Sequence, residues 1–160
     1  MKIKKQVKII QDVIEMVSGY FNLDIEVKIS TGKMPYENDA ETDIECEGFY
    51  SMIFNSHFLR SASDSDIVRI AAHEMVHIKQ YELDGLDLTD EGLFFKGVEW
   101  SGDYWFSPWE IEARGYELAF LSHYLESEEN KEEIVEEKKD AEESKDDDKK
   151  QPPLQINLDF

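Results

Sequence analysis

The chain has 160 residues, 41% of them hydrophobic and 12% aromatic, which is enough for one domain with a hydrophobic core and excludes two independent domains. A formal net charge of −20 excludes direct docking on a nucleic-acid backbone, because phosphate contacts need clustered Lys and Arg. Cys46 is the only cysteine, so an internal disulfide and a thiolate zinc site are excluded, and a reducing, cytoplasmic setting is expected.

Two predicted elements open the chain. Apolar residues recur at steps of three and four between residues 3 and 20, which is the period of an amphipathic helix. They are Ile3, Val7, Ile10, Ile14 and Val17. Charged and amide residues interrupt this run, so we expect no signal peptide, no membrane span and no membrane partner. Residues 24–30 (DIEVKIS) alternate apolar and polar side chains and are typical of a half-buried strand.

A loop and a strand region follow. Residues 31–42 contain Gly, Pro and Asn and are expected to form a loop. Residues 43–55 (DIECEGFYSMIFN) predict one or two short strands, with Gly48 as a bulge or break.

A second helix is predicted from Ser63, which is suited to the N-cap, to about Leu83, before Gly85. Two aspartates in its first turn favour the helix dipole. Residues 86–106 are expected to form a glycine-punctuated aromatic connection, with a short strand at residues 93–100 (LFFKGVEW).

A third helix is predicted to start with Ser107 at the N-cap and Pro108 in the first turn. After it, residues 126–150 hold 13 Asp and Glu against 6 Lys, with almost no apolar side chains. Such a run cannot bury a core, so it is expected to be disordered or to form a lone solvated helix. The expected organisation is a folded domain over residues 1–125, this acidic linker, and a C-terminal peptide over residues 151–160.

The chemistry of the chain centres on the motif HEMVH, residues 73–77. Residues four apart project from one face of a helix, so His73 and His77 can hold one metal ion with Glu74 beside it. The surrounding helix is almost wholly apolar, where adjacent ionisable side chains are costly without partners. Two imidazoles, a metal ion that lowers the pKa of water and a glutamate that takes the proton are what zinc hydrolysis needs. The alternative is that both histidines are ordinary core or surface residues.

HEMVH is the signature of the zincin metallopeptidases, and the chain resembles that superfamily at this motif. Gln80 and Leu83 stand where a metzincin has Gly and a third His, which excludes that branch. A hydrolytic zinc site needs a third protein ligand and one open position. The resemblance to glutamate zincins implies Glu110 as this ligand, because Glu110 and Ala113 fit the Glu-x-x-Ala pattern of a second helix. Arg114 departs from the family pattern, which has an acidic or amide residue at that place.

Three alternatives for the third ligand stay open. Glu112 is favoured by helical periodicity, and His57 and His123 are the remaining histidines. Glu110 also has a purely structural explanation, since Ser107 and Glu110 have the spacing of a capping box in which Glu110 accepts from the Ser107 amide.

The segment from HEMVH through the third helix, residues 65–120, resembles small HExxH metallopeptidase-like proteins of bacteriophages. The resemblance implies a compact α+β zincin, with a small sheet, the histidine helix beneath it and the Glu110 helix packed across. It also implies a host-cell cytoplasmic location. Such proteins bind an extended substrate along an edge strand above the metal, for which Gly48–Asn55 is the candidate; an interior strand is the alternative.

Four side chains are candidates for polarising a scissile carbonyl: Tyr81, Tyr104, Tyr116 and Arg114. The alternative for each tyrosine is a place in the core between helices.

The last ten residues, QPPLQINLDF, differ from the acidic run before them. Residues 155–160 (QINLDF) resemble the hexapeptide by which proteins bind a replication sliding clamp, which implies Gln155, Leu158 and Phe160 as partner-binding residues. The alternatives are a strand that docks back on the domain and a tail without function.

These patterns predict a zinc-dependent metallopeptidase with Zn²⁺ as cofactor, Glu74 as general base and a protein or peptide as substrate. The alternative is a non-catalytic zinc-binding or adaptor protein that acts through its C-terminal peptide.

Overall fold

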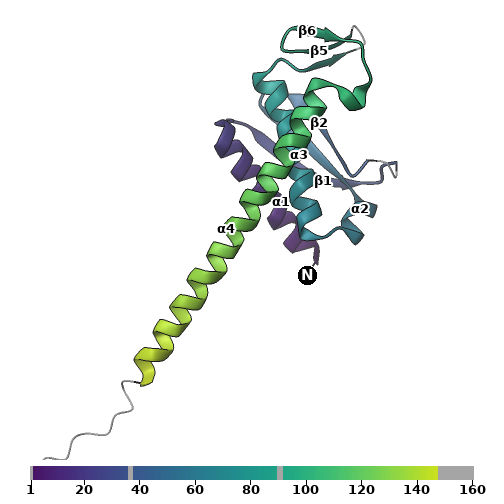
Figure 1. Ribbon diagram of the computed structural model, residues 1–160. Coiled ribbons are helices and arrows are strands. Elements are labelled where there is room, and N and C mark those ends of the chain that lie inside the picture. Colours follow the sequence, from purple (N-terminus) through teal and green to yellow (C-terminus); the bar gives the residue numbers. More distant parts are fainter. Residues whose placement is uncertain (1, 36–37, 90–91, 148–160) are drawn as a thin grey trace, which may run out of the picture. The chain divides into compact units, whose positions relative to one another are not determined.

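The computed structural model describes residues 2–35, 38–89 and 92–147, and the fold is α+β, as the sequence predicts (Figure 1). The chain divides into two compact units, residues 1–124 and 125–160. The predicted partner-binding residues Gln155, Leu158 and Phe160 lie outside the described residues. The elements are α1 (Lys2–Phe21), β1 (Glu26–Gly32), β2 (Ala40–Cys46), β3 (Phe49–Asn55), α2 (Ser56–Ser61), α3 (Asp64–Leu83), β4 (Asp87–Thr89), β5 (Gly92–Phe95), β6 (Val98–Trp100), a short 3-10 helix η1 (Tyr104–Phe106) and α4 (Pro108–Asp147).

The first sheet has the order β1-β3-β2, with β1 parallel and β2 antiparallel to the central β3. Of the two expectations for the stretch from Gly48 to Asn55, the edge strand is wrong and the interior strand is confirmed. The physical reason is burial: β3 is largely buried, whereas most of β2 is exposed. Gly48 lies in the turn between the two strands at φ +72°, a conformation that favours glycine.

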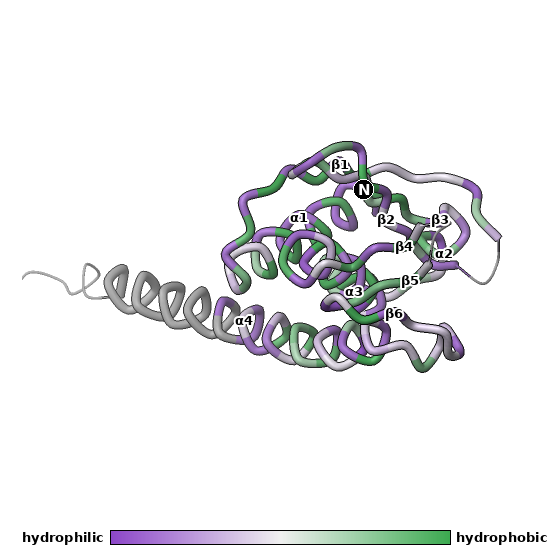
Figure 2. Tube along the Cα trace, turned by 90° about the horizontal axis from the view of Figure 1, so that it is seen from above, coloured by the Kyte–Doolittle hydropathy of each residue, from purple (hydrophilic) through white to green (hydrophobic). Residues whose placement is uncertain are grey.

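The helix α1 confirms the predicted amphipathic helix, but its buried face is rotated from the predicted stripe. Ile10 and Val17 are buried as expected, whereas Ile3 is 73% exposed. Figure 2 shows hydrophobic and hydrophilic residues mixed along α1 and α3, as expected of helices with one buried face. The main core is built from α1, β3, α3 and α4, with Ile9, Ile10, Val13, Val17, Tyr50, Met52, Phe54, Ile67, Val68, Ala71, Ala72, Met75, Val76, Ile78, Ala113 and Phe120.

The helix α3 begins and ends where the sequence predicts. Ser63 is the N-cap of a capping box: its hydroxyl accepts from the Asp66 amide at 3.2 Å, and the Asp66 carboxylate accepts from the Ser63 amide at 3.0 Å. The helix ends at Leu83, and Gly85 follows at φ +64°. The motif HEMVH therefore lies wholly inside this helix, between its defined start and its defined end.

The aromatic connection between α3 and α4 holds more structure than predicted. Where one short strand was expected, β5 and β6 form a hairpin closed by a turn with positive φ at Lys96 and Gly97. With β4 they make a second three-stranded sheet of order β4-β5-β6. Its small core contains the buried residues Leu86, Phe95 and Trp109.

The helix α4 starts at Pro108, as predicted, and extends to Asp147. The third helix therefore continues into the acidic run, up to that residue. One other prediction needs correction, because residues 40–42 belong to β2 rather than to a loop. The short helix α2 was not predicted. Among the described residues, none of the helices has the length and apolar character needed to cross a membrane.

Candidate metal centre

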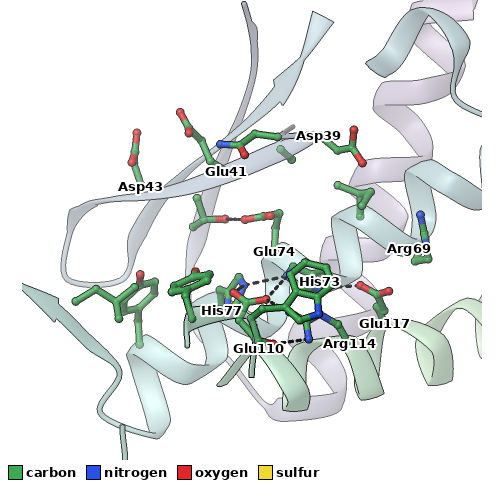
Figure 3. Close-up of a pocket in the computed structure, with 18 residues that line it drawn as sticks. Asp39, Glu41, Asp43, Arg69, His73, Glu74, His77, Glu110, Arg114 and Glu117 are labelled. Carbon is green, nitrogen blue, oxygen red and sulfur yellow. Dashed lines mark hydrogen bonds and ion pairs between the residues drawn. The ribbon is translucent and has the colours of Figure 1, made fainter. Parts of the chain in front are cut away.

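Three predicted ligands converge in the structure. His73 and His77 project from α3 toward Glu110 of α4, and one ligand atom from each lies within 4.8 Å of the others (Figure 3). The two Nε2 atoms are 3.0 Å apart. Glu110 Oε1 is 3.3 Å from Nε2 of His77, and Glu110 Oε2 is 3.5 Å from Nε2 of His73. This cluster could hold a metal ion.

The other ring nitrogen of each histidine is held by a neighbouring side chain. Nδ1 of His73 is 2.8 Å from Oε2 of Glu117, and Nδ1 of His77 is 2.8 Å from Oε1 of Gln80. A carboxylate can only accept, and the amide nitrogen of Gln80 is committed to the Trp109 carbonyl at 2.8 Å. Both Nδ1 atoms must therefore donate, as the orienting partners of metal-bound histidines require.

When both histidines are neutral, donation from Nδ1 leaves both Nε2 atoms as acceptors that face each other. Two lone pairs 3.0 Å apart, with a carboxylate beside them, repel one another unless a cation lies between them. The residues present therefore fit a metal ion, and in its absence a proton must take its place.

The close contacts within the cluster also shift the pKa values of His73 and Glu110. Burial lowers the pKa of His73, but hydrogen bonds to Glu110 and Glu117 outweigh it and raise the pKa to about 9. Burial raises the pKa of Glu110, but hydrogen bonds from His73 and His77 hold it well below its usual range. Glu110 is therefore ionised at neutral pH and available to a cation.

Glu74 lies next to the cluster without being part of it. Its side chain is 7% exposed, and Oε2 accepts a hydrogen bond from the Thr42 hydroxyl of β2 at 2.8 Å. Burial raises the pKa of Glu74, and the charge of His77 and the bond from Thr42 only partly offset this. A buried carboxylate with a raised pKa is a better proton acceptor than an exposed one.

The cluster opens into a cleft of about 860 Å³. One wall is β2 with the residues just before it, the floor is α3, and the facing wall comes from η1 and α4 (Figure 3). His73, Glu74, His77 and Glu110 all line it. The cluster is therefore reachable by a ligand of peptide size.

The alternatives for the third ligand lie elsewhere. Glu112 accepts from Gln80 Nε2 at 2.9 Å and pairs with Lys79 and Lys96, each at 3.3 Å. Among the residues the structure describes, neither His57 nor His123 belongs to the metal cluster.

The capping-box explanation of Glu110 is wrong. The Ser107 amide donates to the Tyr104 carbonyl at 3.0 Å, and the Ser107 hydroxyl is buried without a partner among the described residues. The Glu110 carboxylate faces the histidines instead.

Three of the four candidate polarising groups line the cleft: Tyr81, Tyr104 and Arg114. Arg114 donates to the Trp105 carbonyl at 2.7 Å and lies 3.4 Å from Glu110. Burial and nearby carboxylates raise the pKa values of Tyr81 and Tyr104, so both keep their proton at neutral pH. Tyr116 does not line the cleft; it is half-buried and packs against the main core.

The sequence interpretation missed three residues: Glu117, Gln80 and Thr42. Glu117 follows Glu110 by seven residues, which returns to the same helical face, so periodicity could have indicated it. Gln80 follows His77 by three residues and could have been found in the same way. Thr42 had no local signal, because its contact with Glu74 depends on how the sheet packs on the helix.

Comparison with known protein families, with well-characterised proteins and with solved structures gave no match. The assignment of His73, His77 and Glu110 as a candidate metal centre therefore rests on their geometry.

Proposed function

We propose that the protein is a zinc-dependent metallopeptidase of the glutamate-zincin type, with His73, His77 and Glu110 as zinc ligands and Glu74 as general base. The observation that carries this proposal is the convergence of three ligand atoms at the floor of a cleft, with a buried carboxylate beside them.

The donor set favours zinc. Two imidazole nitrogens and one carboxylate oxygen suit Zn²⁺, whereas Mg²⁺ and Ca²⁺ prefer oxygen ligands throughout. Three protein ligands with the fourth side open are typical of catalytic zinc sites, and four closed ligands are typical of structural ones. The cleft beside the cluster therefore favours catalysis over a structural role.

Bound zinc would supply a Lewis acid that polarises the peptide carbonyl and makes water acidic. Glu74 takes one proton from the attacking water as its oxygen bonds to the carbonyl carbon. The C–N bond then breaks, and Glu74 passes the proton to the leaving nitrogen. Thr42 holds the carboxylate in place. We assign Tyr81 as the donor to the developing oxyanion, because its hydroxyl lines the cleft and burial raises its pKa, so that it keeps its proton.

The edge strand for substrate pairing is β2 rather than the predicted β3. It pairs with β3 alone, so its other side carries backbone groups that no described strand satisfies. It also forms a wall of the cleft directly above Glu74. An extended peptide can add to this edge and bring its backbone over the metal cluster.

Chelation tests the proposal. Purified protein reconstituted with zinc is expected to hold about one zinc per chain and to cleave a pool of diverse peptides, as followed by mass spectrometry. Removal of the metal with a chelator should abolish cleavage, and added zinc should restore it. A folded, zinc-loaded protein that cleaves none of the pool would contradict the proposal.

Glu117→Gln tests the carboxylate that orients His73 through Nδ1. A glutamine can present its amide nitrogen to His73 Nδ1 and no longer stabilises the donating tautomer with a charge, so zinc affinity is expected to fall by about 10- to 100-fold. Competition with a chromophoric chelator measures this. Glu126→Gln, which neutralises an exposed carboxylate of the same helix, should leave the affinity unchanged; equal affinities in the two variants would assign Glu117 no role at the metal.

A further inference from the structure

The β2 wall of the cleft carries three carboxylates, those of Asp39, Glu41 and Asp43. No hydrogen bond or ion pair connects any of them to another described side chain, in contrast to Glu110 and Glu117, which face the histidines. Figure 3 shows Glu41 and Asp43 on the side of β2 that points away from Glu74. The proposed mechanism uses none of the three.

Strand geometry defines what these carboxylates can contact. Side chains alternate between the two faces of a strand, so Thr42 points down to Glu74 while Glu41 and Asp43 lie on the upper face, before and after it. A peptide paired along the open edge runs about 5 Å from β2 and presents alternate side chains on the same upper face. Two of those side chains would lie beside the two carboxylates.

The cations of the cleft do not neutralise this wall. Arg114 is engaged on the facing wall, where it bonds the Trp105 carbonyl, pairs with Glu110 and stacks on the Trp105 ring at 3.8 Å. Arg69 lies on α3, one turn before His73, and among the described residues it forms no ion pair with any of the three carboxylates. The negative wall therefore acts on the part of a ligand that runs along β2.

We propose that the cleft selects extended polypeptide segments with Lys or Arg at alternate positions, through Glu41 and Asp43. The proposal rests on the proposed peptidase function, since it names that site's substrate class. Opposite charges on neighbouring strands stabilise their pairing. The net charge of −20 also attracts cationic chains to the molecule before they dock.

The test uses zinc-loaded full-length protein and three sets of quenched fluorescent peptides. The sets share one sequence and carry Lys, Gln or Glu at every second position. Wild type is expected to cleave the Lys set with a kcat/KM about tenfold above the Gln set, and the Glu set more slowly still. Because the contacts are exposed, the preference should shrink as salt rises from about 0.05 to 0.5 M.

Charge reversal assigns the preference to the wall. The double variant Glu41→Lys/Asp43→Lys should prefer the Glu set. Asp24→Lys/Glu26→Lys makes an equal change in charge at two exposed residues at the start of the opposite edge strand β1, and it should keep the preference for Lys. Equal rates on all sets in wild type, or a preference that survives the double reversal, would overturn the proposal.

A binding measurement separates this proposal from the proposed function. The anisotropy of labelled peptides reports binding to zinc-loaded Glu74→Gln protein without turnover. If wild type cleaves no peptide but this variant binds the Lys set about tenfold tighter than the Gln set, the peptidase assignment fails and the charge selection stands. If wild type cleaves peptides and neither assay shows a charge preference, the selection fails alone.

Discussion

Replacing Glu74 with glutamine is expected to leave zinc bound and to lower kcat for peptide hydrolysis by about 10²- to 10⁴-fold, the range that general acid–base groups contribute. The amide keeps the size of the side chain and can still accept from Thr42, but it cannot take a proton. Burial opposes the charge of Glu74, so its neutral replacement should not destabilise the fold. Zinc content, thermal unfolding and initial rates measured on one preparation check all three statements.

Glu99→Gln is the matched control for this variant. It makes the same chemical change at an exposed carboxylate of β6, so its rate should equal that of wild type. If the Glu74 variant kept about a third of wild-type kcat or more, Glu74 would not be the general base, and the mechanism proposed above would be wrong.

The second large effect is expected from Glu110→Gln. Loss of a ligand should weaken zinc binding by more than the roughly 10- to 100-fold that an orienting partner contributes. An amide cannot replace the carboxylate charge between two histidine nitrogens at 3.3 and 3.5 Å. Zinc per chain after dialysis, together with competition against a chelator, measures the loss.

Glu112→Gln makes the same change two residues along α4 and separates the two candidate ligands. Glu112 accepts from the amide of Gln80, which in turn holds His77, and it pairs with Lys79. We expect its loss to cost about 1 kcal/mol of stability and to leave zinc binding within about tenfold of wild type. If the Glu112 variant lost zinc and the Glu110 variant kept it, the ligand assignment would be reversed.

Local patterns predicted those parts of the site that lie within one helix. His73 and His77 share a face because of their four-residue spacing, and Ser63 caps the helix because its side chain reaches the amide three residues on. The motif pattern also indicated Glu110, and the structure places it beside the histidines.

The parts that depend on packing between elements could not be read from the sequence. Which strand lies at the edge depends on the pairing of β1 and β2 with β3, and the sequence does not specify strand order. Thr42 reaches Glu74 only because β2 lies over α3. Helical periodicity also favoured Glu112. The apolar pattern shows which face of a helix is buried, but it does not show which carboxylate on that helix lies beside the histidines of α3.

The exposed carboxylates of β2 have a further consequence for the molecule in concentrated solution. An unpaired edge strand is a template for joining a second copy of the same sheet, which leads to aggregation. Two such edges brought together would set Glu41, Asp43 and Glu45 of one chain against the same residues of another, and like charges on neighbouring strands repel. The edge thus disfavours self-association while it remains open to a chain of opposite charge.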